Sequence, residues 1–582
     1  MSARHPTAGA RRPLDAALGF VRRHFALLFV LAVFLWSALA ILLYRQAGMP
    51  PGAKIQLRIA HWQLEGGVRQ AFDRMAEEYR KLHPEVAIVQ DAIPEGVYGT
   101  WLTTQLMGGT ASDMIEIGLG VPYNVQLGYL SRYFLPLTPY VNAPNPYNRG
   151  TPLAGLPWRK TYKDGMRNSY VEELQQYLTV PLAQFGIRIF YNRDLLRRLT
   201  GLDEAPREYR AFLRACETIR AQRDENGRPY TPIASSAYHA GMWDGFMCQP
   251  LTYGAVRRVD FNRDGAVGND ELYVGFKTGR IGFDFGPYQA RFRMLRQLTA
   301  QFQTGFTGLG RDEAVFLFAQ QRAVFISTGT WDAGSLLEQA RGVFDVGIMD
   351  FPAPAADDPE FGAFMEGPVY ERPAAGFRFG IARSCKHPEA ALDFLRFLGS
   401  QRGNQELNAI IGWIPAIEGA SVSPLVRAFE PHLEGVFGAM PVDSLGGETS
   451  IRWQQLFALF QVNQIDYERM VAQYEPFYLE RGAEELAEAI RNRRRSVARD
   501  EQFLAGVREL AMSASGAEAA SRWIKYRQLT TGRLLARHLG TALLKKRLDE
   551  GRAANAVGPY EFSPDVIARV RERIRAQRKE RP

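Results

Sequence analysis

The sharpest chemical motif in the chain is a run of acidic and amide side chains, DFNRDGAVGNDE, from Asp260 to Glu271. Its spacing matches the EF-hand loop, which binds Ca²⁺ through oxygen atoms alone. The expected ligands are the side chains of Asp260, Asn262, Asp264 and Glu271 and the carbonyl oxygen of Ala266. An ordinary polar turn is the alternative interpretation, because Asp-Gly and Asn-Asp pairs are frequent in turns. The motif predicts a structural Ca²⁺ ion.

No enzyme motif accompanies this loop. The chain lacks Gly-x-Ser-x-Gly, a Walker loop and His-Glu-x-x-His, and its eight His residues are scattered. A glycosidase, which needs only two facing carboxylates, is the remaining enzyme class. Cys216, Cys248 and Cys385 allow at most one internal disulfide and show no metal-binding spacing. We therefore predict a binding protein rather than an enzyme.

The elements that would position a binding site begin at Ile55. Alternating apolar residues predict a strand that ends at His61 and Trp62, and apolar positions at helical spacing follow from Val68 to Leu82. Two further strands and one helix complete a strand–helix–strand–helix–strand pattern up to Gly120. This order predicts a doubly wound α/β sheet. Ligands bind such sheets beyond the carboxyl ends of the strands, where His61 and Trp62 lie.

Several segments resemble, in the same order, the family 1 extracellular solute-binding proteins, the maltose-binding-protein-like receptors of ABC sugar importers. They read GGTASDMIEI, VPLAQFGIRIFYNRDLL, AVFISTGTWDAGSLL, DVGIMDFPAP and GWIPAI, and the resemblance covers roughly Ile55 to Ala472. It implies a periplasmic-binding-protein type II fold, with two doubly wound α/β lobes joined by crossover segments. It also implies extracytoplasmic binding of a carbohydrate or a related polar solute, and delivery to ABC permease subunits.

A sugar receptor needs aromatic planes for the CH faces of the ring and polar side chains for its hydroxyls. Candidates of both kinds lie near strand ends within the matching segments, and Arg378 is a further cation there. The predicted ligand-binding residues are His61, Trp62, Glu65, Tyr123, Trp243, Asp244, Trp331, Asp332, Phe379 and Trp413. For each tryptophan, packing in the core is the competing interpretation.

The charge is unevenly distributed along the chain. The whole sequence carries a net charge of +9, residues 1–24 carry +4 and residues 519–582 carry +10, so the long middle section is mildly acidic. An acidic middle argues against nucleic-acid binding, and basic ends suggest contact with a membrane surface or a protein partner.

Residues 25–44 contain no charged side chain and follow Arg22 and Arg23. Twenty helical residues span the hydrocarbon core of a bilayer, and basic residues before them favour a cytoplasmic N-terminus. We expect a single-pass anchor in the inner (cytoplasmic) membrane with the body facing the periplasm or the cell exterior. A cleaved signal peptide ending near Ala40 is the alternative.

The expected organisation has five parts: a basic arm (1–24), the transmembrane helix (25–44), a linker (45–53), a two-lobed binding domain (54–512) and a basic helical extension (513–582). Within the domain we expect lobe one at about 54–178 and 328–377, lobe two at about 183–322, and later helices at 381–512. The alternative function is a membrane-tethered ligand sensor or cell-surface binding protein with a structural calcium site.

Overall fold

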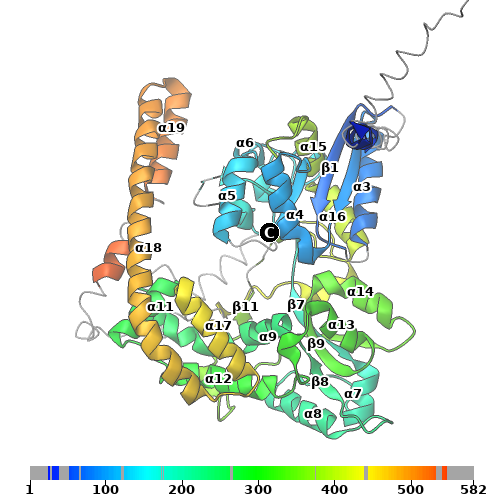
Figure 1. Cartoon of the computed structure of the whole chain (residues 1–582), viewed down its shortest axis with the longest axis vertical. Helices are drawn as coiled ribbons and strands as arrows, with labels where there is room; N and C mark the ends of the chain where they lie inside the picture. Colours follow the sequence, from blue (N-terminus) through cyan, green and yellow to red (C-terminus); the bar gives the residue numbers. More distant parts are fainter. Residues whose placement is uncertain are drawn as a thin grey trace, which may run out of the picture. The chain divides into compact units, whose positions relative to one another are not determined.

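The computed structural model describes residues 24–25, 29–37, 52–64, 67–118, 123–171, 174, 176–261, 267–371, 373, 375–437, 444–531 and 540–546 (Figure 1). The chain divides into two compact units. Unit 1 takes residues 1–182, 376–411 and 415–420, and unit 2 takes residues 183–375, 412–414 and 421–582.

Unit 1 is built on a five-stranded sheet in the order β2 (Val86–Ala92), β1 (Ile55–His61), β3 (Met114–Ile117), β12 (Ala375–Ile381) and β6 (Val180–Gln184). β1 runs parallel to β2 and to β3, whereas β12 is antiparallel to β3. The chain passes from one unit to the other within β6 and again at the start of β12.

The helices between these strands confirm the expected pattern. α3 (Val68–Leu82) buries Val68, Phe72, Met75 and Tyr79, so the apolar stripe read from the sequence faces the sheet. α4 (Glu95–Gly108) ends where Gly109 takes a left-handed conformation, which glycine adopts without steric cost. The other unit 1 elements are α5 (Tyr123–Tyr133), α6 (Thr138–Val141), β4 (Tyr170–Val171), β5 (Gln176–Tyr177), α15 (Pro388–Leu398) and α16 (Gln401–Ile411).

Unit 2 contains a four-stranded sheet in the order β10 (Val346–Met349), β7 (Ile187–Asn192), β9 (Ala323–Gly329) and β8 (Thr231–Ala234). β8 is parallel to β9, and β7 is antiparallel to β9. Its helices are α7 (Arg193–Thr200), α8 (Tyr209–Ala221), α9 (Ala237–Trp243), α10 (Val256–Val259), α11 (Asn269–Thr278), α12 (Gly286–Thr299), α13 (Arg311–Ala319) and α14 (Thr330–Ala340). A short sheet pairs β11 (Val369–Tyr370) with β13 (Val436–Phe437).

Three further helices follow β13 in unit 2: α17 (Gly447–Gln461), α18 (Tyr467–Met512) and α19 (Gly516–Leu529). Trp453 on α17 and Tyr474 on α18 join one aromatic core with residues of α11 and α12. α19 lies beside the far end of α18 (Figure 1).

The division of the chain differs from the expected one after residue 328. We placed 328–377 in the first lobe, but β10 pairs with β7 and therefore completes the sheet of unit 2. Unit 2 continues to residue 375, and unit 1 resumes only with β12 and the helices α15 and α16. A four-residue apolar strand such as β10 carries no pattern that selects one sheet over another.

Among the described residues, no helix combines the length and the apolar character that crossing a membrane requires. Of the expected span 25–44, the structure describes only residue 25 and residues 29–37, all helical. The remainder of that span lies outside the described residues, as do residues 1–23 and 547–582.

Candidate functional site

In unit 1, the carboxyl ends of β1 and β3 bring an indole, a glycine and a guanidinium together. Trp62, which directly follows β1, is half-buried, and its ring packs against Tyr98 with the ring centroids 5.0 Å apart. A Cβ atom on Gly118 would lie 3.6 Å from the Trp62 ring and 3.5 Å from the Arg378 guanidinium. Both groups therefore approach the backbone just after β3.

The backbone at this edge is held by a buried carboxylate. Glu116 of β3 is fully buried. Its carboxylate accepts hydrogen bonds from the backbone N–H of Trp62 at 3.2 Å and from the side-chain amide of Gln63 at 2.9 Å. The Arg378 side chain donates to the carbonyl oxygen of Asn168 at 2.8 Å. These contacts fix the segment after β1 and orient the guanidinium beside the indole.

The other unit 1 candidates do not join this group. His61 is fully buried, contacts Gln90 at 3.0 Å and stacks on Phe72, and burial lowers the pKa of its imidazole. Phe379 is also fully buried, so both residues belong to the core and not to the surface we expected. Glu65 and the side chain of Tyr123 lie outside the described residues.

In unit 2, aromatic side chains gather at one edge of the four-stranded sheet. β8 and β9 end at this edge, and β7 begins there, because Ile187 lies opposite Gly329. Phe185, immediately before β7, contacts Trp331 with centroids 5.6 Å apart and Trp413 with centroids 5.1 Å apart. Trp413 is fully buried, so it packs beneath this group and does not offer the ligand-binding surface that we expected. Tyr238 of α9 lies 6.5 Å from Trp331 between centroids and is 48% exposed, so the group reaches solvent.

Trp331 depends on a glycine to take its position. An ideal Cβ atom on Gly329 would lie 2.3 Å from the Trp331 ring, which is closer than any real contact. The indole is therefore folded back over the end of β9, where only a hydrogen atom leaves it room. This packing leaves the ring half-buried at the sheet edge.

Polar groups at the same edge lack partners within the described part of the chain. The Ser236 hydroxyl contacts His239 Nδ1 at 2.9 Å, but His239 Nε2 and Trp331 Nε1 are buried without a hydrogen bond. Burial, with a smaller contribution from Arg311, lowers the pKa of His239 to about 4, so the ring is neutral at neutral pH. A buried polar atom without a partner is destabilising unless a ligand or water satisfies it.

Asp332 supports this edge instead of facing outward. Its carboxylate accepts from the Thr328 hydroxyl at 2.5 Å and from the Arg311 guanidinium at 3.0 Å, and the residue is buried. These contacts tie the first turn of α14 to the end of β9 and to the start of α13. Asp332 thus positions Trp331, its neighbour in the chain.

Trp243 and Asp244 are core residues, and their assignment as ligand-binding residues is corrected here. The Trp243 ring is fully buried and packs on Phe351 with centroids 5.3 Å apart. Asp244 forms a buried ion pair with Arg291 at 2.8 Å. The reason is geometric, because the start of α9 lies at the sheet edge whereas its last turn points into the core.

The residues at this edge that sequence reasoning missed are Phe185, Ser236, Tyr238, His239 and Arg311. Phe185 lies inside the segment VPLAQFGIRIFYNRDLL, and Ser236, Tyr238 and His239 follow closely after the apolar residues of β8. The available signal was their place directly before or after a predicted strand.

The acidic loop is described only at its two flanks. Asn262, Asp264 and Ala266 lie outside the described residues. The carboxylate of Glu271 accepts hydrogen bonds from the N–H groups of Phe261 at 3.1 Å and Gly268 at 3.0 Å, which closes the loop and caps α11. Among the described residues, no group of three or more His, Cys, Asp or Glu side chains could hold a metal ion.

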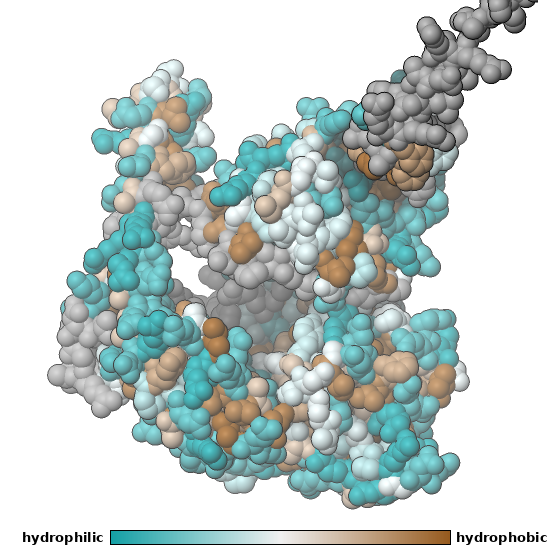
Figure 2. Space-filling model, viewed as in Figure 1, coloured by the Kyte–Doolittle hydropathy of each residue, from teal (hydrophilic) through white to brown (hydrophobic). Residues whose placement is uncertain are grey.

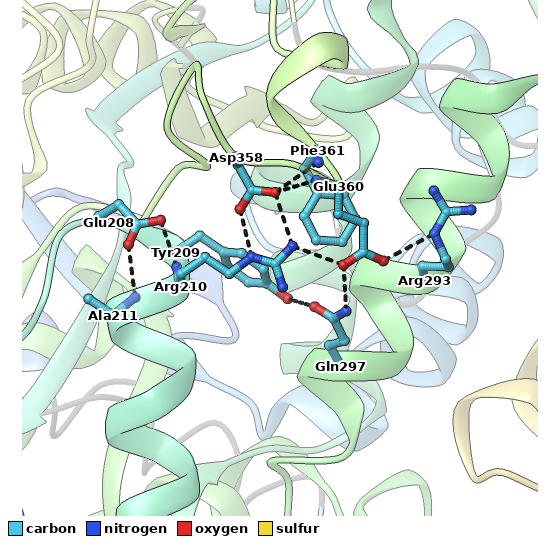
Figure 3. A network of polar contacts seen from close by, with 9 residues as sticks. All are labelled: Glu208, Tyr209, Arg210, Ala211, Arg293, Gln297, Asp358, Glu360 and Phe361. Atoms are coloured by element: carbon cyan, nitrogen blue, oxygen red, sulfur yellow. Dashed lines mark hydrogen bonds and ion pairs between the residues drawn. The ribbon is translucent and has the colours of Figure 1, made fainter.

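Unit 2 also contains a network of charged side chains, shown in Figure 3. Arg210 at the start of α8 donates to Asp358 at 2.7 and 3.0 Å and to Glu360 at 2.9 Å, and Arg293 of α12 donates to Glu360 at 3.1 Å. The hydrogen bonds from Arg210 hold the pKa of Asp358 below its usual value. A pocket of about 800 Å³ opens beside this network. Since cations and carboxylates are matched in number, we assign the network a structural role, fastening the segment before β11 to α8 and α12.

Comparison with known proteins places the chain among binding proteins. Residues 65–405 match the family described as bacterial extracellular solute-binding protein. The multiple sugar-binding protein of Streptococcus mutans is 20% identical over 359 residues, which cover 60% of this chain and 72% of that protein. An uncharacterized ABC transporter extracellular-binding protein of Pyrococcus horikoshii is 23% identical over 386 residues, covering 63% of this chain and 73% of that protein.

Solved structures share the fold. A protein from a study of xylan utilization by Caldanaerobius polysaccharolyticus aligns with a TM-score of 0.51 at 18% identity, over 72% of this chain and 99% of that chain. The apo form of RafE from Streptococcus pneumoniae aligns with a TM-score of 0.50 at 16% identity, over 74% of this chain and 99% of that chain.

Proposed function

Because the chain belongs to the bacterial extracellular solute-binding protein family, we propose that it binds a carbohydrate outside the cytoplasm and delivers it to an ABC importer. The multiple sugar-binding protein of Streptococcus mutans supports the ligand class, and the ABC transporter extracellular-binding protein of Pyrococcus horikoshii supports the partner class. The alternative function, a tethered sensor, has no support from these relatives. The closure of two lobes on the solute remains a prediction.

The observation that carries this proposal is the aromatic edge of unit 2. A sugar ring stacks its CH face on an aromatic plane, and Trp331 and Tyr238 offer such planes. Its hydroxyls can donate to and accept from neutral polar groups, and His239 Nε2 and Trp331 Nε1 are buried there without partners. A neutral histidine and an indole N–H suit an uncharged polyhydroxyl ligand.

Isothermal calorimetry of the full chain against a panel of oligosaccharides and polyols tests the proposal. We expect at least one sugar to bind, and Tyr238→Ala to weaken that binding. Phe316→Ala is the matched control, because Phe316 is an exposed aromatic residue of unit 2 on α13. A folded protein that binds no sugar of the panel would contradict the proposed ligand class.

We also propose that the acidic loop binds Ca²⁺ as a structural ion. The ligand set from Asp260 to Glu271 consists of hard oxygen donors, which suit Ca²⁺. Glu271 would have to offer its carboxylate to the ion while keeping its loop-closing hydrogen bonds. Removal of calcium should lower the melting temperature, since free ion at a hundredfold excess over the dissociation constant contributes about 2.7 kcal/mol.

The calcium experiment compares two variants with and without a chelator. Glu271→Gln should abolish the calcium-dependent part of the melting temperature, whereas Asp270→Asn, one residue earlier and outside the ligand pattern, should retain it. Identical melting curves of the unmodified protein with calcium and with chelator would refute the site.

Finally, we propose that residues 25–44 anchor the protein in the inner membrane with the body outside. The uncharged length of the segment supports this, and the described helical part, residues 29–37, exposes large apolar side chains such as Phe34 and Trp36. Carbonate extraction of membranes should leave the full chain in the pellet, and release into the supernatant would favour a cleaved leader.

A further inference from the structure

Four buried polar atoms at the aromatic edge of unit 2 have no hydrogen-bond partner within the described part of the chain. They are Nε2 of His239, Nε1 of Trp331 and the hydroxyl oxygens of Ser327 and Thr330. On the face that Figure 2 shows, hydrophilic residues cover much of the surface of unit 2, where water can satisfy them. The four atoms at the edge are buried, so each needs a specific partner.

The hydrogen bond between Ser236 and His239 indicates which nitrogen of the imidazole carries the proton. The Ser236 hydroxyl lies 2.9 Å from His239 Nδ1, and its oxygen also faces the backbone N–H of His239 at 3.4 Å. Among the residues that the structure describes, Nδ1 is the one acceptor within reach of the serine hydrogen. The Ser236 hydroxyl therefore donates to Nδ1, because the other tautomer would bury that hydrogen without an acceptor.

The charge state of His239 completes the assignment. Burial, together with the nearby Arg311 guanidinium, lowers the pKa of His239 to about 4, so the ring carries a single proton at neutral pH. Since Nδ1 accepts from Ser236, that proton lies on Nε2, and Nε2 is a donor. The indole Nε1 of Trp331 is a donor in every state. Both unpartnered ring nitrogens of this edge thus present N–H groups.

The charged groups beside these donors favour an acceptor as well. Arg311 lies close enough to His239 to lower its pKa, and its guanidinium donates to Asp332 at 3.0 Å. The Asp332 carboxylate also accepts from the Thr328 hydroxyl, so it is already occupied within the protein. An oxygen with free lone pairs suits such an edge, whereas a protonated amino group would face N–H donors and a cation.

We infer that His239 determines specificity at this edge by donating its Nε2–H to an oxygen acceptor of the bound sugar, and that Ser236 is the positioning residue that fixes this tautomer. The edge selects a sugar whose contacting group accepts a hydrogen bond, and it rejects an amino sugar that is protonated at that position. This selection rests on the proposed binding of a carbohydrate, but the tautomer of the sugar-free protein does not.

Nuclear magnetic resonance of the full chain, labelled with nitrogen-15 in histidine and free of sugar, tests the tautomer. We expect His239, assigned by the signal that His239→Gln removes, to be protonated at Nε2 and unprotonated at Nδ1. Ser236→Ala should populate the other tautomer. Ser335→Ala is the matched control, because the Ser335 hydroxyl donates to the carbonyl oxygen of Asp332. A proton on Nδ1 in the unmodified protein would overturn the inference.

Analogues of the best-binding sugar test the selection by calorimetry. At one ring position, the deoxy analogue should bind about tenfold more weakly, and the deoxyfluoro analogue, which accepts but cannot donate, should recover part of the loss. The protonated amino analogue should bind no better than the deoxy analogue. His239→Phe, which keeps an aromatic ring without a donor, should abolish the difference between deoxy and deoxyfluoro analogues, and circular dichroism checks that it folds.

The outcomes separate this inference from the proposed function. Equal losses for the deoxy and deoxyfluoro analogues at every ring position, or full affinity for the protonated amino analogues at every position, would overturn the selection while sugar binding stands. A panel in which no sugar binds would overturn the proposed function and the selection together. The assignment of the Nε2 proton would then still stand on the resonance measurement.

Discussion

The two sheets present different chemistry at the edges where their strands end. In unit 1 a single half-buried indole, Trp62, lies beside the Arg378 guanidinium, and a fully buried carboxylate holds the backbone. In unit 2, Phe185, Tyr238 and Trp331 form an aromatic group around neutral polar atoms. The same strand-end position is thus used for a charged contact in one unit and for stacking in the other.

This difference predicts that the two edges would make different kinds of contact with a bound solute. We expect the aromatic edge of unit 2 to contribute the larger share of the affinity, because stacking removes large apolar surfaces from water. We expect the edge with Arg378 to contribute directed hydrogen bonds, which affect the choice of ligand more than the affinity.

The largest expected effect separates the core of unit 2 from its edge. Trp243→Ala should lower the free energy of unfolding by about 3–5 kcal/mol, because it removes a fully buried ring from the core. Trp331→Ala should cost clearly less stability, since that ring is half-buried. Thermal and denaturant unfolding of both variants measure the difference, and equal losses would mean that Trp331 is a core residue as well.

The next effect compares the two edges directly. Trp331→Ala should weaken sugar binding by about 2 kcal/mol or more, roughly thirtyfold, as truncation of a central aromatic contact does. Trp62→Ala should weaken it less, because Trp62 already packs on Tyr98. Calorimetry with the best ligand of the panel gives both values, and a larger loss for Trp62→Ala would reverse the assignment of roles.

A smaller effect tests the backbone of the unit 1 edge. Gly118 has a φ of +149°, so Gly118→Ala should cost about 1–3 kcal/mol of stability. Gly128 is the control, since it lies within α5 and an added Cβ atom would meet no atom within 4 Å. Gly128→Ala should be neutral or stabilising. Equal melting temperatures for the two variants would show that the Gly118 conformation is not needed.

The smallest effect concerns pH. His239 is kept neutral in the folded state, with a pKa of about 4, whereas an unfolded histidine titrates near 6.5. The unfolded state therefore binds the proton first, and stability should fall as pH drops from 6.5 towards 4, by about 1 kcal/mol between pH 6.5 and 5.5. His239→Gln should remove this part of the pH dependence when unfolding is measured between pH 6.5 and 5.5. If the free energy of unfolding of the variant changed with pH as steeply as that of the unmodified protein, His239 would not be the cause.

The fold of unit 1 was predictable, because α3 is amphipathic and is flanked by two strands. In β1 apolar and polar residues alternate, and β2 begins with four consecutive apolar residues. Val68, Phe72, Met75 and Tyr79 repeat at helical spacing, and one face of the helix is buried as that spacing requires. Trp62 and Trp331 were predictable as edge residues because each closely follows a strand. The assignment of β10 to the sheet of unit 2 was not predictable, since a strand of four apolar residues suits either sheet.

Residues within turns and short helices carried less information. Phe185 stands alone between two strands, and no periodicity marks its direction. Trp243 and Tyr238 lie on the same seven-residue helix, yet one is fully buried and the other is 48% exposed. The orientation of such a short helix is set by packing against α12 and β9, which the local sequence does not contain.

Residues 491–503 of α18, which precede the buried Leu504, have a consequence for local unfolding. None of the side chains that the structure describes in this stretch is buried, so the hydrogen bonds within the helix and the ion pair of Arg493 with Asp270 are the main contacts that oppose its opening. It contains Arg491, Arg494 and Arg495 in exposed positions, which are cleavage sites for a trypsin-like protease. After a cut there, the two parts of the chain would be joined only by packing such as that of Leu544, which is buried in the same aromatic core as Trp453.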